Sequence, residues 1–365
     1  MNQKRTGVVL SIMLSVLLIL SATEASPQAW KVEWEKILAA AKKEGKVVIA
    51  GPPGQTYRDA LVAFQKTYPE IQVDYVGTQG RDFAPRIMQE RHAGQYLWDL
   101  NIGGGATMFN TLMPAKVLDP LRPALIMPDL IQDKTWRSGF DDGWVDLGKR
   151  HIYAFVSYVL YAVYVNRDVI PESEFSKAED LWNPKWKGKI VFHDPRREGI
   201  GTHQGTVILL NFGEPALRRL FKDQEPVIIE DYRQIAEWAA RGRYPIALGI
   251  NLPNLAALRK EGVGKNLLPV EDPKLASAIA GFGNVALINQ APHPNAAKVY
   301  LNWLLSKEGQ SIFARLTGEN GRRIDAEIGD KEYLPKPGVH YLNGQKQEHQ
   351  EVRLKVNQIA KEIFR

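Results

Sequence analysis

Residues 77–107 read GTQGRDFAPRIMQERHAGQYLWDLNIGGGAT, and they hold two glycine turns with a helical and a strand pattern between them. The first turn, 77–81, follows the alternating apolar residues of 71–76, and the second, 103–107, follows the strand pattern of 97–102. In open α/β sheets, loops that leave the carboxyl ends of strands line the ligand crevice, and helix N-termini there offer free N–H groups. We therefore hypothesise that both turns face one ligand. The alternative is that the glycines only form tight strand-to-helix corners.

Strand and helix patterns also alternate around this stretch. Residues 46–50 form a strand pattern, and Thr56 with Asp59 gives the T-x-x-D spacing of a helix N-terminus. Residues 190–193, 245–250 and 279–288 are further strand patterns, each next to a helical pattern. The alternation predicts α/β architecture, with sheets covered by helices on both faces.

The chain opens with the pattern of a signal peptide. Lys4 and Arg5 precede the apolar run 7–20, and small or polar residues follow. We interpret residues 1–25 as a signal peptide that is cleaved after Ala25, with an uncleaved anchor as the alternative.

Composition narrows the function classes. The sequence has no cysteine, which excludes disulfides, cysteine-ligated metals and thiol catalysis. Export without cysteine suits a soluble protein of the bacterial periplasm. The net charge of +6 is spread along the chain, so we expect no nucleic-acid partner.

The remaining length suits two domains. After Met113 the chain becomes rich in proline and loses its periodicity, and we interpret this segment as a crossing between two lobes. We assign residues 26–117 and 279–318 to lobe 1, and residues 118–278 and 319–365 to lobe 2.

Motifs for catalysis are absent. The sequence contains no G-x-S-x-G, H-E-x-x-H or G-x-x-x-x-G-K-[ST] pattern. His193, Asp194 and His203 are donors that could hold a first-row metal, although histidines that simply form hydrogen bonds are the alternative. We expect no enzyme activity, no cofactor and no bound metal.

Arg81 is the charge with the clearest possible role. It follows Gly80 at the expected start of a helix, where a guanidinium beside free N–H groups would bind a carboxylate or phosphate. The alternative is an exposed arginine, or one paired with Asp82 or Asp99.

Several motifs, taken in order, give a resemblance that covers nearly all of the mature chain. They include residues 40–47 (AAKKEGKV), 64–73 (FQKTYPEIQV), Trp98-Asp99, Asn166, 181–189 (LWNPKWKGK) and 291–297 (APHPNAA). With these motifs the chain resembles type II periplasmic solute-binding proteins of ABC importers, in the branch of ferric-iron, thiamine and phosphonate binders.

This resemblance implies a two-lobed type II periplasmic fold with mixed sheets, helices on both faces and crossing strands as a hinge. It also implies a soluble monomer that closes around its solute and delivers it to a permease in the inner membrane. Ferric-iron members carry adjacent tyrosines after the strand equivalent to 245–250, where this sequence has Asn251. We therefore expect a small anionic organic solute, with metal binding in the same transport class, or an exported enzyme on the same fold, as alternatives.

The candidate solute-binding residues come from glycine turns, hydroxyls, amides and one arginine. In lobe 1 they are Gln55, Thr56, Thr78, Gln79, Gly80, Arg81, Gly104, Gly105 and Thr107; at the crossing, Tyr158; and in lobe 2, Asp194, Gly201, Thr202 and Asn251.

Overall fold

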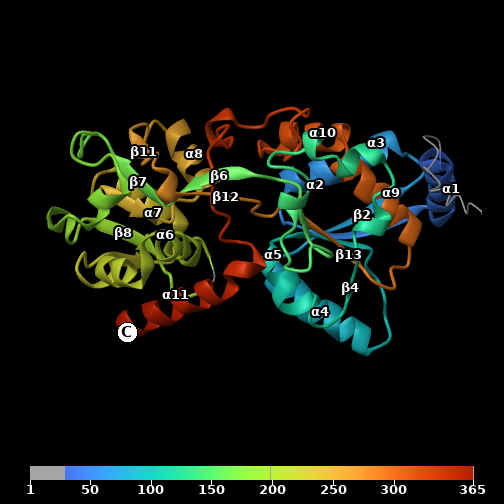
Figure 1. The fold of residues 1–365 in the computed structure, drawn as a ribbon, viewed down its shortest axis with the longest axis horizontal. Helices are drawn as coiled ribbons and strands as arrows, with labels where there is room; N and C mark the ends of the chain where they lie inside the picture. The colour runs from blue at the N-terminus through green and yellow to red at the C-terminus, as the bar shows by residue number, and fades with distance from the viewer. Residues whose placement is uncertain (1–28, 198, 365) are drawn as a thin grey trace, which may run out of the picture.

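A computed structural model of the protein describes residues 29–197 and 199–364. The predicted signal peptide lies outside the described residues. The chain forms two α/β lobes, side by side along the longest axis of the molecule (Figure 1). Within the described residues, no helix is both long enough and apolar enough to cross a membrane.

Lobe 1 is built on a six-stranded sheet in the order β2-β1-β3-β13-β4, with β5 also paired to β13. The strands β1, β2 and β3 are parallel, whereas β13 is antiparallel to its neighbours. The strands are β1 (Lys46–Gly51), β2 (Gln72–Gly77), β3 (Leu100–Gly103), β4 (Leu118–Asp119), β5 (Tyr153–Ala154) and β13 (Asn284–Ile288); the helices are α1 (Ala29–Glu44), α2 (Gln55–Val62), α3 (Phe64–Thr67), α4 (Gly80–His92), α5 (Gly105–Thr107), α9 (Pro294–Leu305) and α10 (Lys307–Thr317).

Strand β1 shows why helices cover both faces of this sheet. Val47 and Ile49 point into a core that includes residues of α1, α2 and α9. Ala50 belongs to the core on the opposite face, with Phe83 and Ile87 of α4. Because side chains alternate along a strand, a strand that is apolar on both sides needs a helix on each face.

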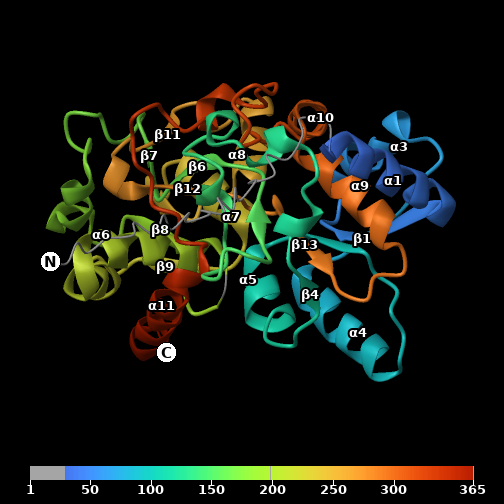
Figure 2. The same ribbon diagram turned by 45° about the vertical axis from the view of Figure 1, so that its right-hand side comes forward.

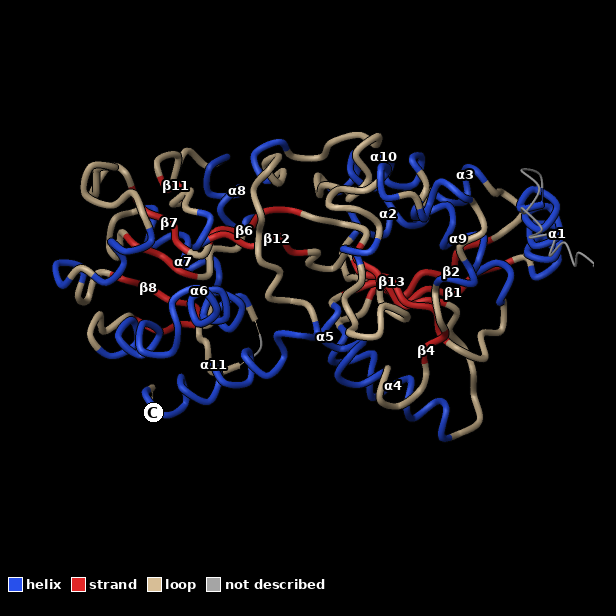
Figure 3. The backbone as a smooth tube through the Cα atoms, viewed as in Figure 1, coloured by secondary structure: helices blue, strands red, loops and turns tan. Residues whose placement is uncertain are grey.

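Lobe 2 repeats this plan with the strand order β11-β7-β10-β8-β9. Phe192 packs on the side of α6 and α11, and Val191 packs on the side of α7 and α8. The strands are β7 (Val163–Asn166), β8 (Ile190–His193), β9 (Val227–Ile229), β10 (Ile246–Leu248) and β11 (Leu267–Pro269); the helices are α6 (Ile200–Lys222, kinked at Gly213), α7 (Tyr232–Ala240), α8 (Leu252–Lys260) and α11 (Gln350–Ile363). Figure 3 shows helices on both sides of the strands in each lobe.

The lobes are joined by a two-stranded antiparallel ribbon of β6 (Tyr158–Tyr161) and β12 (Ala276–Ile279). It lies between the two sheets in Figure 1. A third connection follows α10, and its residue Leu342 accepts a hydrogen bond from Ala278 of β12. The expected crossing strands are therefore present.

The position of the crossing differs from the sequence prediction. Strands β4 and β5 pair with β13, and Trp136, Phe140 and Trp144 pack in the lobe 1 core. Residues 118–156 thus lie with lobe 1, not with lobe 2 as we predicted from the prolines. Residues 321–323 also bridge to this part of lobe 1, and α11 packs on α6 of lobe 2. The sequence of this segment shows no helical or strand periodicity because the segment consists of short 3₁₀ turns and aromatic packing contacts, without long helices or strands.

The predicted strand 279–288 is likewise two strands. Strand β12 ends at Ile279 and β13 begins at Asn284. Gly281, between them, has a φ of +55°, which favours glycine and turns the chain from the hinge into the lobe 1 sheet.

Candidate functional site

The two glycine turns of residues 77–107 touch each other. Gly80, the first residue of α4, lies so close to Thr107 that a Cβ on Gly80 would come within 2.3 Å of the threonine Oγ1. The first turn also contacts the loop after β1: Thr78 N–H donates to Gly51 O at 2.8 Å, and a Cβ on Gly77 would lie 3.3 Å from Pro53 Cα. Three loops at the carboxyl ends of parallel strands therefore form one surface.

The loop between β12 and β13 extends this surface. The Asn284 amide donates to Gly103 O at 2.9 Å and to Gly281 O at 3.2 Å, and so joins the end of β3 to the end of the hinge. The Phe282 ring meets the Tyr57 ring of α2 edge-on, with the centroids 6.0 Å apart. The contacts lead back to the loop after β1, so the four loops form a continuous ring. We call this ring the lobe 1 half-site.

Helices that begin at the half-site have no side-chain N-cap. No capping side-chain bond is made by Gly54 before α2, by Gln79 before α4 or by Gly104 before α5. The first N–H groups of a helix have no partner within the helix, and a negative group satisfies them well. Figure 1 shows α2 and α5 on the side of lobe 1 that faces lobe 2.

Helix α9, at the opposite end of the sheet, has its N-terminus filled by a carboxylate. Glu44 accepts hydrogen bonds from the backbone N–H groups of Asn295, at 3.2 Å, and of Ala296, at 2.7 Å. One helix N-terminus of lobe 1 is thus occupied by an internal carboxylate, whereas three at the half-site have no side-chain cap.

Arg81 is an exposed cation of the half-site. Its side chain is 85% exposed, and the carboxylate nearest to it is that of Asp82, 3.9 Å away. It does not pair with Asp99, which is fully buried and bonded to Val48 and His293. An exposed pair at this distance contributes little to stability, so Asp82 does not hold the guanidinium firmly.

The other predicted lobe 1 residues differ in how their side chains are used. Gln55 is exposed and donates to Asp59 at 2.6 Å, while Thr56 is exposed. The Thr78 hydroxyl is half-buried and donates to Gln79 O at 3.3 Å. Gly104 faces open space, whereas Gly105 is buried against Val145 and Asn284.

In lobe 2, the predicted residues are held more tightly within the lobe. Asp194 is buried and accepts a hydrogen bond from Arg196 at 2.7 Å. Burial alone would raise the pKa of Asp194, but the hydrogen bonds with Arg196 outweigh it and the pKa is lowered. Thr202 is fully buried, and its hydroxyl donates to Arg197 O at 2.5 Å. Gly201 permits close packing, because a Cβ there would lie 2.1 Å from His193 O. The structure therefore brings these residues together around the start of α6, with their side chains turned to the protein.

Asn251 lies at the start of α8, and its side chain caps that helix by accepting from Asn254 N at 3.2 Å. Tyr158 is half-buried on β6, and its hydroxyl lies beside Gly281. Burial raises the pKa of Tyr158 above its usual range. Tyr158 therefore lies on the ribbon that joins the lobes, and Asn251 lies at the start of a lobe 2 helix.

Sequence reasoning missed a cluster around Tyr57. The Tyr57 hydroxyl donates to Glu319 Oε1 at 2.5 Å, although 262 residues separate them. The other oxygen, Oε2, is buried without a hydrogen-bond partner among the described residues, and burial raises the pKa of Glu319 to about 7. Phe282, 37% exposed, completes the cluster. Only a long-range contact identifies these residues, because Glu319 lies in a stretch with no periodic pattern.

The metal alternative finds no support in the geometry. His193 Nδ1 accepts from Gly201 N at 3.2 Å, Asp194 is paired with Arg196, and His203 Nε2 contacts Ser277 Oγ at 2.8 Å. Within residues 29–197 and 199–364, no three acidic or histidine side chains gather as metal ligands would. Burial lowers the pKa of His203 to about 3, so it is neutral and serves as a hydrogen-bonding group of the interior.

Comparison with known proteins agrees with this architecture. The model of the family described as "Bacterial extracellular solute-binding protein" matches residues 46–316. Among solved structures, the chain is similar to the Trichodesmium protein IdiA (FutA) in complex with iron and citrate, at 17% identity over 88% of this chain and 99% of that one, with a TM-score of 0.66. The Bordetella ferric binding protein is 16% identical over 87% of this chain and 98% of that one, with a TM-score of 0.67. AfuA from Actinobacillus pleuropneumoniae, with exogenous fructose-6-phosphate bound, is 19% identical over 87% of this chain and 98% of that one, with a TM-score of 0.57.

The chain belongs to the family of bacterial extracellular solute-binding proteins. The predicted type II periplasmic binding fold and the role of solute-binding component of an ABC importer are confirmed. The solved relatives are too distant in sequence to define the solute of this chain.

Proposed function

We propose that this protein binds a small anionic organic solute between its two lobes in the periplasm and delivers it, unchanged and as a monomer, to the permease of an ABC importer. The observation that carries the proposal is the start of α4, where a helix N-terminus without a side-chain cap lies beside an exposed guanidinium. Backbone N–H groups and arginine together recognise phosphate and carboxylate oxygens.

The two lobes would make unequal contributions to this site. Lobe 1 offers Arg81, the hydroxyl of Thr56 and the open starts of α2 and α5. Lobe 2 offers the partly exposed backbone of Gly199 and Ile200 at the start of α6, whereas the next N–H group, that of Gly201, already donates to His193 Nδ1. Since Asp194 and Thr202 already have internal partners, we place their side chains behind the backbone that meets the solute. A solute that contacts both lobes would favour the closed state over the open one.

The similar structures include both classes of ligand. AfuA has fructose-6-phosphate bound, which supports an organic anion, whereas the Bordetella protein is a ferric binding protein and the Trichodesmium protein has iron bound together with citrate. Adjacent tyrosines of the kind that the resemblance associates with ferric iron are missing after β10, where the chain has Asn251 and Leu252. We therefore favour the organic anion over the metal ion as the group that this protein recognises.

Mass spectrometry of the small molecules that co-purify with the untagged protein would test the proposal directly. In parallel, the melting temperature would be measured separately with citrate, fructose-6-phosphate, methylphosphonate, neutral fructose and ferric ion, each at a concentration far above the expected Kd. A solute at about 100 times its Kd stabilises the folded state by roughly 2.7 kcal/mol, which is a shift of several degrees. Stabilisation by fructose alone or by ferric ion alone would contradict the proposal, and turnover of a bound anion would favour an enzyme.

A further inference from the structure

Phe282 is the exposed apolar side chain of the lobe 1 half-site. Among the described residues of its four loops, 51–57, 77–81, 103–107 and 280–284, no other aromatic or large aliphatic side chain is exposed, whereas Phe282 is 37% exposed. The Tyr57 ring supports it edge-on, in an arrangement that aromatic pairs favour. Solute sites combine a few polar groups with apolar and aromatic walls, and burial of an exposed ring against a solute is favourable.

The turn that carries Phe282 lies where the hinge enters lobe 1. Figures 1 and 2 show β6 and β12 side by side between the lobes, and Ile279, the last residue of β12, pairs with Tyr158, the first residue of β6. The next residues, 280–283, connect β12 to β13 of the lobe 1 sheet. Phe282 therefore lies at the lobe 1 end of the ribbon that joins the lobes.

The backbone on both sides of Phe282 is packed closely against the hinge. A Cβ on Gly281 would lie 2.7 Å from Tyr158 Oη. A Cβ on Gly283 would lie 2.2 Å from Val156 Cβ. Because neither glycine leaves space beside its neighbour, the turn holds the ring of Phe282 in one place.

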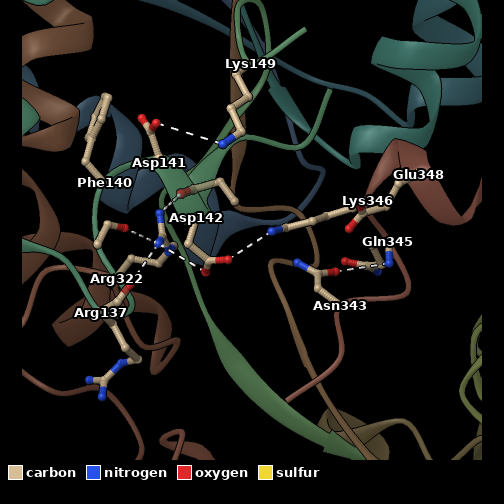
Figure 4. A network of polar contacts seen from close by, with 12 residues as sticks. Arg137, Phe140, Asp141, Asp142, Lys149, Arg322, Asn343, Gln345, Lys346 and Glu348 are labelled. Atoms are coloured by element: carbon tan, nitrogen blue, oxygen red, sulfur yellow. Dashed lines mark hydrogen bonds and ion pairs between the residues drawn. The ribbon is translucent and has the colours of Figure 1, made fainter. Parts of the chain in front are cut away.

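The side chain of Gln345 holds the same turn from the C-terminal segment. Its Oε1 accepts a hydrogen bond from Gly281 N at 3.3 Å. Figure 4 shows the contacts that hold this segment on lobe 1: Lys346 Nζ lies 2.9 Å from Asp142, which also contacts the buried Arg322 at 3.4 Å. A ring presented by a turn that is fixed in this way loses little conformational entropy when a solute binds.

A buried acceptor without a partner lies beside the same rings. The Tyr57 hydroxyl donates to Glu319 Oε1, whereas Glu319 Oε2 is buried and has no hydrogen-bond partner among the described residues. The next residue, Asn320, accepts from Ser157 N at 2.8 Å, which places Glu319 at the same end of the hinge. An unpaired buried acceptor is unfavourable, and a donor group of the solute would satisfy it. An uncharged hydroxyl suits this buried position better than a charged amine.

We propose that Phe282 is a specificity-determining residue of the solute site: its ring contacts the carbon skeleton of the anion, and the solute is a hydroxylated organic anion and not a one-carbon anion. The inference rests on the proposed function, because it takes the lobe 1 half-site as the place where the anion binds. It goes beyond that function by assigning the charged group to Arg81 and the skeleton to Phe282, at another part of the half-site.

Phe282→Ala tests the inference with fructose-6-phosphate and methyl phosphate, two phosphate monoesters that share the charged group and differ in the skeleton. The Kd of each ester would be measured by calorimetry for the wild type and the variant. We expect the wild type to bind fructose-6-phosphate at least tenfold more tightly than methyl phosphate, and the variant to lose roughly tenfold in Kd for fructose-6-phosphate alone. A general defect of the turn would raise both Kd values by the same factor, so their ratio separates a contact with the solute from a structural role.

Tyr96→Ala is the matched control. Tyr96 is an aromatic residue of lobe 1 that is 41% exposed, and it follows the end of α4, away from the start of that helix at the half-site. We expect both Kd values of this variant to stay within twofold of the wild type, whereas Phe282→Leu, which keeps an apolar side chain, should retain most of the preference.

Three results would overturn the inference and leave an anion-binding protein. They are an unchanged ratio of Kd values in Phe282→Ala, an equal change of the ratio in Tyr96→Ala, or a wild type that binds methyl phosphate as tightly as fructose-6-phosphate. If neither ester binds, the inference fails as well, and the melting temperatures with citrate and methylphosphonate decide separately whether the proposed function stands.

Discussion

Gly80 and Thr107 are in direct contact, so the first residue of α4 rests on the last residue of α5. The two turns that carry them leave different strands, β2 and β3, which are separated in the sheet by β1. Glycine at position 80 makes the contact possible, because any side chain would overlap Thr107. This contact turns two separate helix starts into one continuous surface.

Gly80→Ala is therefore expected to push α4 and α5 apart. The added Cβ would lie 2.3 Å from Thr107 Oγ1 and 2.9 Å from its Cβ, and rotation of the threonine relieves only the first overlap. Overpacking of this size costs about 1–2 kcal/mol of unfolding free energy, measured by chemical denaturation. The double variant Gly80→Ala/Thr107→Gly should lose less unfolding free energy than the two single variants lose together. Strict additivity would show that the contact does not couple the turns.

Arg81→Ala separates binding from folding. The side chain is 85% exposed, and its pairing with Asp82 is long, so the melting temperature should change by less than about 1 °C. Loss of a charge-assisted contact to an anion should raise the Kd at least tenfold, measured by calorimetry with the anion found in the wild-type protein. Arg86→Ala is a suitable control, because Arg86 lies on the same helix and pairs with Glu90. Equal binding by the Arg81 variant would remove the arginine from the site.

Glu319 gives the lobe 1 half-site a pH-dependent stability. Burial raises the pKa of its carboxyl from 4.5 to about 7, while Tyr57 and Tyr158, the titratable groups beside it, have pKa values raised far above neutrality. The folded state thus binds a proton between pH 4.5 and 7 that the unfolded state has lost. Stability from this group is complete below pH 4.5 and decreases as the pH rises to 7, by about 3 kcal/mol in total.

The variant Glu319→Gln isolates this effect, since an amide keeps the acceptor for Tyr57 but does not titrate. Between pH 5 and pH 8 the wild type should lose about 2–3 kcal/mol of unfolding free energy relative to the variant. Burial lowers the pKa of His203 to about 3, so its contribution to stability is lost as the pH falls. His203 is present in both proteins, and its contribution therefore cancels in the difference. A pH-independent difference would show that Glu319 titrates normally.

Much of the fold was predictable because the motifs of the resemblance are structural contacts. Asp99 belongs to one motif and accepts hydrogen bonds from the backbone and ring of His293, which belongs to another motif. Glu44, from a third motif, accepts a hydrogen bond at the start of α9 in the same part of lobe 1. Asn166 donates to Ala239 O and Ala240 O at the end of α7. Such residues report a fold that distant relatives share, and they say nothing of the solute.

The prediction failed where local pattern does not determine the structure. The prolines after Met113 indicated a crossing, yet β4 and β5 are short strands that only β13 organises. In the half-site, the glycine turns could be recognised from their place after strands. Phe282 and Glu319 could not, since their roles depend on contacts with Tyr57, more than 200 residues earlier in the chain.

The structural character of these motifs leads to a prediction for Asp99. Its fully buried carboxylate accepts from Val48 N at 2.7 Å, His293 N at 2.8 Å and His293 Nδ1 at 2.9 Å, so both oxygens are used. In Asp99→Asn one oxygen becomes an amide that faces an N–H donor. We expect a loss of about 2–4 kcal/mol of unfolding free energy by chemical denaturation, with the Kd for the solute unchanged in the folded fraction. Asp223→Asn, at an exposed ion pair with Arg219, should lose less than about 0.5 kcal/mol. If Asp99→Asn were as stable as that control, or if it lost solute binding while remaining folded, the motif would have a functional role and not the structural one that its contacts indicate.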